Sequence, residues 1–465
     1  MSPAIVWLRR DLRLADNPAL LAAAEGGRPL IALYILEGGL GGASRWWLHH
    51  SLGALAHDLR ECGGTLTLAR GRPEAVLSKL IEETGAGAVY WNRLYEPAAI
   101  ARDKALKAQL RSQGVDAHSF NAALLHEPWA VATQAGGPFK VFTPFWRACR
   151  QRPVATPAEP APAAINGLTV SGDTLADWSL LPKAPDWSAG FGGWNPGEAG
   201  AQAALELFLD HAVKHYAQAR DRPGVAGTSR LAPHLHFGEI GPRQVWSAVA
   251  ALGGEGQGAT VFESELGWRE FCHHVLFHFP AMAEENLRDG FAFPWRDDPD
   301  GLAAWQRGQT GFPLVDAGMR ELWTTGFMHN RVRMIVASFL IKDLMIDWRV
   351  GAAWFLDTLI DADLAANSFN WQWAAGCGFD AAPYFRVFNP SGQGERFDAE
   401  GAYVRRWCPE LTRLPDKWLH RPWEAPAAVL AQAGVVLGKS YPAPIVDHAL
   451  ARDRALAAFK ALRQG

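Results

Sequence analysis

The chain has 465 residues, of which 49% are hydrophobic and 20% charged, and its formal net charge is −3. This length predicts two or three domains that fold without disulfides or metals, and the near-neutral charge excludes DNA binding through a globally basic surface. No apolar run is long enough to cross a bilayer, and the first ten residues do not resemble a secretory signal. We therefore expect a cytoplasmic protein with no membrane partner.

Tryptophan and cysteine usage narrow the classes of function further. There are 21 Trp against 7 Tyr, an excess that indicates aromatic recognition or electron transfer in addition to core packing. The five cysteines lie far apart in the sequence and form no C-x-x-C pair. We expect free thiols and no metal site.

The first 130 residues alternate between strand-like and helix-like stretches. Apolar runs of strand length occupy residues 4–8, 30–36, 65–68 and 88–91, with helix-like stretches at 17–24, 46–62, 73–84 and 97–112. This alternation predicts a Rossmann-like α/β domain over residues 1–130, with a parallel sheet and helices on both of its faces. No G-x-G-x-x-G follows a strand, so the dinucleotide fingerprint of a dehydrogenase is missing.

The rest of the chain divides into a connector and a helical region. Residues 131–199 include a Pro-, Ala-, Gly- and Trp-rich stretch that predicts a connector wrapped over the surface. From residue 200 to 465 no run alternates with period two for long, which predicts an all-α domain. The helix-like stretches there are 201–219, 243–252, 260–277, 311–326, 330–346 and 351–359.

One helix-like stretch carries polar and aromatic side chains on a single face. Phe262, Glu265, Trp268, Arg269 and Cys272 recur at spacings of three and four residues. A face with a carboxylate, an indole and a guanidinium does not suit a core, because unpaired charges are costly to bury. It is either a solvated face with a Glu–Arg pair or the wall of a cleft.

Two further segments suggest polar sites at helix starts. Asn330, Arg333 and Met334 share a face of an apolar helix, which indicates either a polar cavity or a helix capped by Asn330 with solvated arginines. Residues 227–230 (GTSR) precede a likely helix start with two hydroxyls and an arginine. That pattern suits a phosphate, although such a segment is usually only a helix cap.

A third segment places acids and indoles close together. Asp363, Asn367 and Trp371 recur at four-residue spacing, while Trp373 lies on the opposite side of the same helix. The acids either pair with arginines such as Arg333 or lie at a solvated helix end.

These segments, taken together, resemble the signature stretches of the cryptochrome and photolyase family. The matching stretches are GTSRL, ELGWREF, MHNRVRM and DADLAAN followed by WQW, with IVWLRRDLRLADNPAL at the start and AAPYFRVFNPSGQGERFD near the end. The resemblance covers essentially the whole chain and implies an antenna chromophore on the α/β domain and FAD, folded into a U shape, in the helical domain. In the photolyases of this family, light drives an electron from reduced flavin into a pyrimidine dimer, which splits and returns the electron.

The resemblance also implies roles for individual residues in holding FAD. The phosphates are held by Thr228, Ser229, Arg230 and Leu231, and further flavin contacts come from Tyr216, Phe262, Arg269, Arg333, Asp361 and Asp363. Asn367 matches the residue that faces flavin N5, and asparagine there suits a photolyase. The chain that reduces oxidised flavin in light is matched by Trp371, Trp348 and Trp295.

The same resemblance implies a lesion pocket and an arginine track for DNA. The pocket residues are Glu265, Trp268, Asn330, Met334 and Trp373, where the two indoles flank the flipped dimer. A dimer is already poorly paired, so its extrusion from the duplex costs less than that of a normal base pair. The DNA phosphates are matched to Arg220, Arg269, Arg331 and Arg386.

Fewer positions indicate which lesion is repaired and which antenna chromophore is bound. Enzymes for (6-4) photoproducts use a histidine pair where this chain has only His329. This difference favours repair of cyclobutane pyrimidine dimers, with a (6-4) photolyase or a blue-light signalling cryptochrome as alternatives. The stretch 95–99 resembles the bacterial branch with a methenyltetrahydrofolate antenna, but Ala98 and Ala99 replace polar residues of the better-known folate sites. A deazaflavin, FMN or no antenna stays open, and we expect a monomer.

Overall fold

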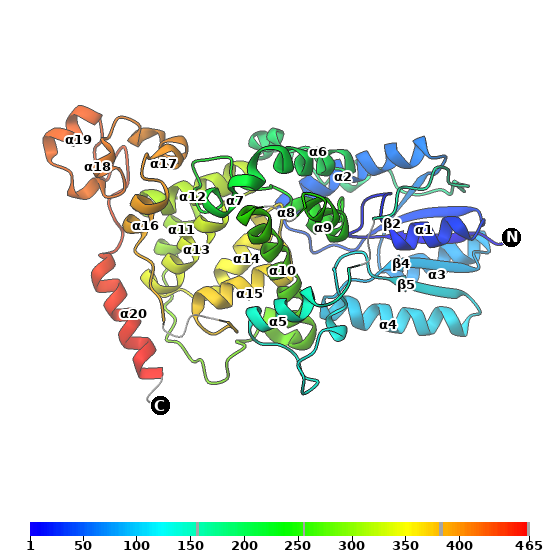
Figure 1. Cartoon of the computed structure of the whole chain (residues 1–465). Helices are drawn as coiled ribbons and strands as arrows, with labels where there is room; N and C mark the ends of the chain where they lie inside the picture. The colour runs from blue at the N-terminus through cyan, green and yellow to red at the C-terminus, as the bar shows by residue number, and fades with distance from the viewer. Residues whose placement is uncertain (155–157, 254–255, 381–384, 463–465) are drawn as a thin grey trace.

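Five parallel strands form a sheet in the first part of the chain, as the computed structural model shows (Figure 1). The structure describes residues 1–154, 158–253, 256–380 and 385–462. The strand order is β3-β2-β1-β4-β5. The strands are β1 (Ala4–Leu8), β2 (Leu30–Leu36), β3 (Leu66–Arg70), β4 (Ala88–Asn92) and β5 (Asp116–Phe120).

Four strands lie close to their predicted positions, and the fifth is additional. β1 is buried along its whole length, which explains why its sequence is continuously apolar rather than alternating. β5 has the sequence DAHSF, whose polar residues gave no strand signal. It forms because the backbone of β4 offers a parallel edge, on which Ala88 pairs with Asp116.

Helices cover both faces of this sheet, as the alternation predicted. α1 (Pro18–Glu25) and α2 (Gly42–Glu61) pack with one set of strand side chains, which includes Val6 and Leu8. α3 (Pro73–Thr84) and α4 (Pro97–Ser112) pack with the opposite set, which includes Ile5 and Trp7. The prediction of a Rossmann-like α/β arrangement is confirmed.

The connector is partly buried, which the sequence did not indicate. After α5 (Phe142–Arg150), it places Trp178, Leu180 and Phe191 in the hydrophobic core next to the sheet. It also forms a parallel bridge between Leu30 and Gly167. The expectation of a surface segment is wrong for these positions, because large apolar side chains between the prolines and glycines gain free energy by burial.

The remainder of the described chain is helical, as predicted. None of its helices is long and apolar enough to span a bilayer. The predicted stretch 330–346 is interrupted, because α13 ends at Ser338 and a wider π-helical turn follows. The helices are α6 (Glu198–Leu207), α7 (Tyr216–Ala219), α8 (Ala232–Phe237), α9 (Pro242–Ala250), α10 (Gln257–His278), α11 (Pro299–Gln306), α12 (Pro313–Thr325), α13 (Asn330–Ser338), α14 (Trp348–Thr358), α15 (Leu364–Ala375), α16 (Pro390–Phe397), α17 (Ala402–Trp407), α18 (Asp416–Leu419), α19 (Ala427–Ala433) and α20 (His448–Leu462).

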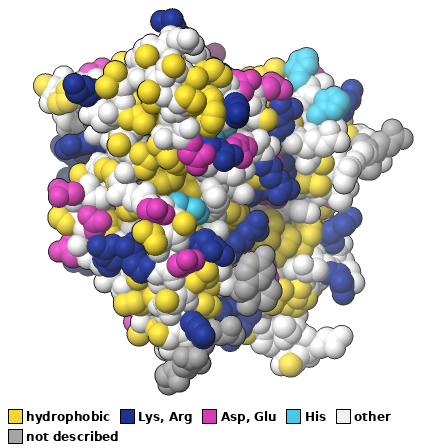
Figure 2. Space-filling model, turned by 90° about the vertical axis from the view of Figure 1, so that its left-hand side faces the viewer, with side chains coloured by type: hydrophobic (Ala, Val, Ile, Leu, Met, Phe, Trp, Pro, Cys, Tyr) yellow, Lys and Arg dark blue, Asp and Glu magenta, His cyan; other side chains and the backbone are white. Residues whose placement is uncertain are grey.

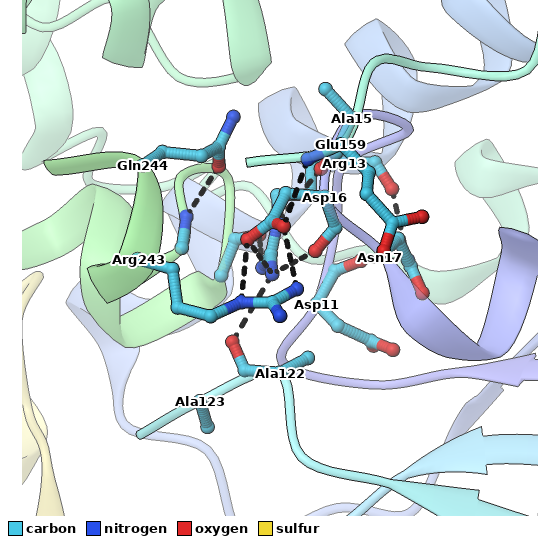
Figure 3. A network of polar contacts seen from close by, with 12 residues as sticks. Asp11, Arg13, Ala15, Asp16, Asn17, Ala122, Ala123, Glu159, Arg243 and Gln244 are labelled. Carbon is cyan, nitrogen blue, oxygen red and sulfur yellow. Dashed lines mark hydrogen bonds and ion pairs between the residues drawn. The ribbon is translucent and has the colours of Figure 1, made fainter. Parts of the chain in front are cut away.

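A buried polar network joins the sheet region to the helical region (Figure 3). Arg13, which is 1% exposed, donates to the carbonyl oxygens of Ala122 at 3.1 Å and Gly238 at 2.9 Å. Asp16, in the same loop after β1, pairs with Arg243 of α9 at 2.5 Å. Buried charges are tolerated only when they are paired in this way, so the network fixes how the two regions sit against each other.

Candidate active site

An open cavity of about 300 Å³ lies among α8, α10 and the starts of α13 and α15. Its wall includes Phe262, Glu265, Trp268, Arg269 and Cys272, all from α10. The sequence left open whether this face is solvated or lines a cleft, and the structure shows that it lines a cleft. The same cavity is also lined by the other predicted FAD contacts, which are Tyr216, Thr228, Ser229, Arg230, Leu231, Arg333, Asp361 and Asp363.

An ion pair stands on one side of the cavity. Arg333 Nη2 lies 2.9 Å from Asp361 Oδ2, and its Nε donates to the carbonyl oxygen of Met328 at 2.7 Å. The alternative in which Asn330 caps α13 is wrong, because the ring of His329 caps the helix by accepting from the Arg331 N–H. Asn330 therefore keeps its amide for the cavity, which it lines.

Two buried histidines surround a carboxylate on the cavity wall. Asp363 caps α15 by accepting from the Ala366 N–H at 2.8 Å, and its Oδ2 lies 3.4 Å from His273 Nε2 and 3.9 Å from His236 Nδ1. Burial acts to raise its pKa, but the two histidines outweigh burial and hold the pKa of Asp363 well below its usual value. A negative charge is therefore maintained at this wall.

The turn before α8 brings two hydroxyl side chains, Thr228 and Ser229, to the cavity. The backbone of Arg230 has a left-handed φ of 55°, and its guanidinium lies 3.9 Å from the centre of the Trp194 ring. Gly227 suits its position because a Cβ there would lie 2.7 Å from the Ala219 carbonyl oxygen. The turn therefore holds two hydroxyls and a cation at one end of the cavity.

A second hollow adjoins the first through shared residues. Trp373 and Met334 line it together with Asn367 and Trp371, and Asn330 lines both hollows. The structure thus brings the five predicted lesion residues around two adjoining hollows: Glu265 and Trp268 line the main cavity, Met334 and Trp373 line the second hollow, and Asn330 lines both. The amide of Asn367 is held by donation of its Nδ2 to the Ala352 carbonyl oxygen at 3.0 Å.

The predicted electron-transfer tryptophans differ in exposure. Trp371 is 2% exposed and Trp348 0%, whereas Trp295 is only partly buried. Trp305, which the sequence did not single out, has its ring centre 6.3 Å from that of Trp371. It lies far from the family motifs in sequence, so no spacing could have indicated it.

The four arginines predicted to meet DNA are less free than expected. Arg220 contacts the carboxylate of Glu265, Arg331 pairs with Asp221 at 2.8 Å, and Arg269 donates to the Ala123 carbonyl oxygen at 2.6 Å. Arg386 is exposed and its guanidinium lies over the Phe388 ring. One face of the molecule carries separate groups of Lys and Arg among hydrophobic and acidic side chains (Figure 2). The residues 381–384 of the predicted segment before Arg386 lie outside the described residues.

The main cavity fits the FAD that the sequence motifs imply. Its hydroxyls and Arg230 suit phosphates, and the Arg333–Asp361 pair offers polar groups to a heteroaromatic ring.

A third hollow, of about 330 Å³, lies away from this site. It is formed where the start of α2 meets the ends of α12 and α14, and it is lined by Arg45, Trp187 and Trp323. Trp323 is 53% exposed, and its ring stacks on that of Trp354 at 6.0 Å and 8°. Gly42 lies close to the Trp187 ring, from which a Cβ would be 3.2 Å away, and its N–H donates to Asp357 at 2.8 Å.

Comparisons with known proteins agree with this arrangement. Residues 4–163 match the family model described as DNA photolyase, and residues 262–461 match the FAD binding domain of DNA photolyase. The chain is 54% identical to a deoxyribodipyrimidine photo-lyase of Agrobacterium fabrum over 100% of this chain and 98% of that protein. It is 41% identical to cryptochrome-1 of Arabidopsis thaliana over 96% of this chain and 69% of that protein. The crystal structure of a bacterial class III photolyase from Agrobacterium tumefaciens superposes with a TM-score of 0.98 at 53% identity, covering 100% of this chain and 98% of that one.

Proposed function

The chain belongs to the DNA photolyase and cryptochrome family, and from that premise we propose that it splits cyclobutane pyrimidine dimers in DNA with the energy of light. The observation that carries the proposal is the pair of adjoining hollows that share Asn330. Glu265 and Trp268 line the main cavity, and Met334 and Trp373 line the second hollow, so that two indoles and two hydrogen-bonding side chains of the predicted lesion site lie in one region. The relatives named as photolyases support the same reaction.

We assign FAD to the main cavity. Bound and reduced, it supplies the excited electron that opens the cyclobutane ring and takes the electron back. Thr228 and Ser229 would hold the phosphates, while Arg333 and Asp361 would orient the flavin ring by presenting a fixed ion pair. Asn367 lines the adjoining hollow, where its amide is held by the Ala352 carbonyl oxygen. By the family resemblance, this amide would face flavin N5.

The lesion is recognised by shape and by hydrogen bonds. A flipped dimer presents two saturated rings, which fit against the apolar faces of Trp268 and Trp373. Glu265 and Asn330 would bond to the base edges, which normal pairs keep inside the duplex. Because a dimer is already unstacked, its extrusion costs less than that of intact bases, and this difference contributes selectivity.

Because the arginines are already paired with carboxylates, a DNA phosphate must displace a carboxylate in order to bind them. Arg220 and Arg331 are held by Glu265 and Asp221 in the protein alone. A phosphate that engages either arginine must compete with that carboxylate. We expect binding to weaken steeply with salt, because each phosphate contact releases counterions.

The antenna chromophore is best accommodated in the third hollow. Ligands of parallel sheets usually bind at the carboxyl ends of the strands, but here Arg9 and Arg102 lie over the Trp7 ring at 4.4 and 4.9 Å and Arg9 pairs with Asp103 at 2.7 Å. That edge is filled by a buried polar network. The third hollow instead offers Trp187 and Trp323 as flat faces and Arg45 as a cation.

These features favour methenyltetrahydrofolate, a planar conjugated molecule with carboxylates, over deazaflavin or FMN. Replacing Trp323 by Ala is expected to remove the folate absorbance from the purified protein and leave the flavin content unchanged. Retained folate would place the antenna elsewhere. We further propose that the protein works as a monomer in the cytoplasm, and that Trp371, Trp348 and Trp295 carry electrons to oxidised flavin.

The decisive experiment follows repair directly. The reduced protein is mixed with single-stranded DNA that contains thymine dimers, and absorbance near the thymine band is recorded under blue or near-UV light. Light-dependent recovery that is missing in the dark control supports dimer repair. No recovery with flavin bound and reduced would refute the proposal and favour a signalling role.

A further inference from the structure

A tryptophan from the connector lies against the arginine that we assign to the FAD phosphates. Trp194 follows the 3-10 turn η3 (Ser188–Gly193) and is partly buried. The Arg230 guanidinium lies 3.9 Å from the centre of the Trp194 ring and 5.5 Å from that of the Phe327 ring. The two ring centres are 5.6 Å apart. The cation therefore lies against two aromatic rings, which attract it electrostatically.

These rings are the contacts that hold the Arg230 side chain. Within the described residues, this side chain forms no ion pair or hydrogen bond. Arg333, another cation that lines the cavity, is instead paired with Asp361 at 2.9 Å. A contact with Trp194 and Phe327 uses no hydrogen-bond acceptor, so the N–H donors of the Arg230 guanidinium stay available to a phosphate.

The Trp194 indole is itself fixed by two helices. Its Nε1–H donates to the Thr325 carbonyl oxygen at the end of α12 at 2.9 Å. Its ring packs against that of Trp47 on α2, with centres 5.6 Å apart and an interplanar angle of 65°. The turn before it fits closely on α12, because a Cβ at Gly190 would lie 2.1 Å from the Thr324 carbonyl oxygen. The position of the indole is therefore set by α2 and α12, outside the loop that carries the arginine.

Trp47 also supports the helix that follows Arg230. The Trp47 Nε1–H donates to the buried Glu239 carboxylate at 2.9 Å, and the other oxygen of Glu239 lies 2.5 Å from Nδ1 of His234 on α8. α8 starts at Ala232, two residues after Arg230. One side chain of α2 thus contacts both the ring behind the guanidinium and the residues that hold α8.

We propose that Trp194 is a positioning residue for FAD, whose ring holds the Arg230 guanidinium where the phosphates bind. The inference deepens the proposed function and rests on the assignment of FAD to the main cavity. Among the described residues, the cavity is lined by Arg230 and Phe327 but not by Trp194, so Trp194 acts through the arginine. A side chain that is held in advance loses less conformational freedom when it binds a phosphate.

The test measures FAD affinity of the full chain after its flavin has been removed, by following flavin fluorescence as FAD is added back. Trp194→Leu is expected to raise the Kd for FAD about 2- to 5-fold, the range that corresponds to one cation–π contact. Trp194→Phe keeps a ring face and should bind FAD more tightly than Trp194→Leu. Trp246→Leu is the matched control, because the Trp246 ring is also partly buried but packs against Trp146 and makes no cation–π contact within the described residues.

A second measurement separates positioning of the arginine from a general loss of structure. Arg230→Asn removes the cation and tolerates the left-handed backbone at this position. In this background Trp194→Leu should cause no further loss of FAD affinity, because its effect passes through Arg230. With Arg230 present, the loss in Trp194→Leu should shrink at high salt, because salt screens the attraction between guanidinium and phosphate.

Three results would each overturn the inference. They are an unchanged Kd in Trp194→Leu, the same loss in Trp194→Phe or in the control, and a loss that persists in the Arg230→Asn background. Failure of the unmodified protein to bind FAD would refute the cofactor assignment itself. Absence of dimer repair in the FAD-bound protein would refute the proposed function without changing these affinities, so the failures are distinguishable.

Discussion

Replacing Glu265 by Gln is expected to separate lesion recognition from general DNA binding. In the structure the Glu265 carboxylate contacts Arg220, and the two side chains are 28% and 23% exposed. Burial raises the pKa of Glu265, and Arg220 opposes that shift. Glutamine keeps the shape and an acceptor but not the charge, so Arg220 loses its ionic partner and becomes available to a phosphate.

The two effects are measured by different quantities, the Kd for dimer DNA and the salt dependence of binding to undamaged DNA. A hydrogen bond to a charged group contributes about 1.5–3 kcal/mol and one between neutral groups about 0.5–1.5 kcal/mol. The change therefore costs about 1–1.5 kcal/mol of dimer binding, roughly a 5- to 12-fold higher Kd. One additional phosphate contact by Arg220 would steepen the salt dependence on undamaged DNA by up to about 0.9 in the log–log slope.

Fluorescence anisotropy with labelled oligonucleotides, with and without a dimer, measures both quantities over a series of salt concentrations. Glu263→Gln is the control, because Glu263 lies on the same helix but outside the cavity lining. An unchanged slope on undamaged DNA, or the same changes in the control, would refute the argument that Glu265 restrains Arg220.

Three further changes test other parts of the site. Trp348→Phe should abolish light-driven reduction of oxidised flavin, because phenylalanine is harder to oxidise, while chemically reduced protein still repairs dimers; flavin absorbance under blue light with an external reductant measures this. Arg333→Ala leaves Asp361, whose side chain is 6% exposed, without its partner and should lower the free energy of unfolding by about 3 kcal/mol, measured by urea titration; unchanged stability would contradict the pairing argument. Burial lowers the pKa of His329 from 6.5 to about 4, so the unfolded chain binds a proton before the folded one, and stability should fall by up to about 3 kcal/mol as pH drops from about 6.5 to about 4. His329→Asn keeps a capping side chain and should flatten that loss in urea midpoints at successive pH values.

Local sequence signals predicted most of the fold because burial leaves a strong pattern. β1 and β2 are recognisable because both faces are covered, so every position is apolar. β5 escaped notice because an edge strand keeps polar residues. The burial of Trp178 and Phe191 escaped notice because proline and glycine around them indicated a loop.

The same difference between local and long-range signals applies to the candidate site. The spacing on α10 placed Glu265 and Trp268 on one wall, since neighbours along a helix are set by its geometry alone. The contact of Glu265 with Arg220 and the stack of Phe142 on Trp268 join distant parts of the chain. Only the tertiary fold creates such pairs, so no spacing rule could have indicated them.

The polar network around Arg13 and Asp16 limits how the protein can be divided into separately expressed halves. A helical half expressed alone would leave Arg243 without Asp16 and expose a surface shaped to receive the loop after β1. The sheet half alone would bury Arg13 with fewer acceptors, since the Gly238 carbonyl would be missing. Exchanging either half with a relative, to graft a different antenna for example, would therefore require carrying both sides of this network across together.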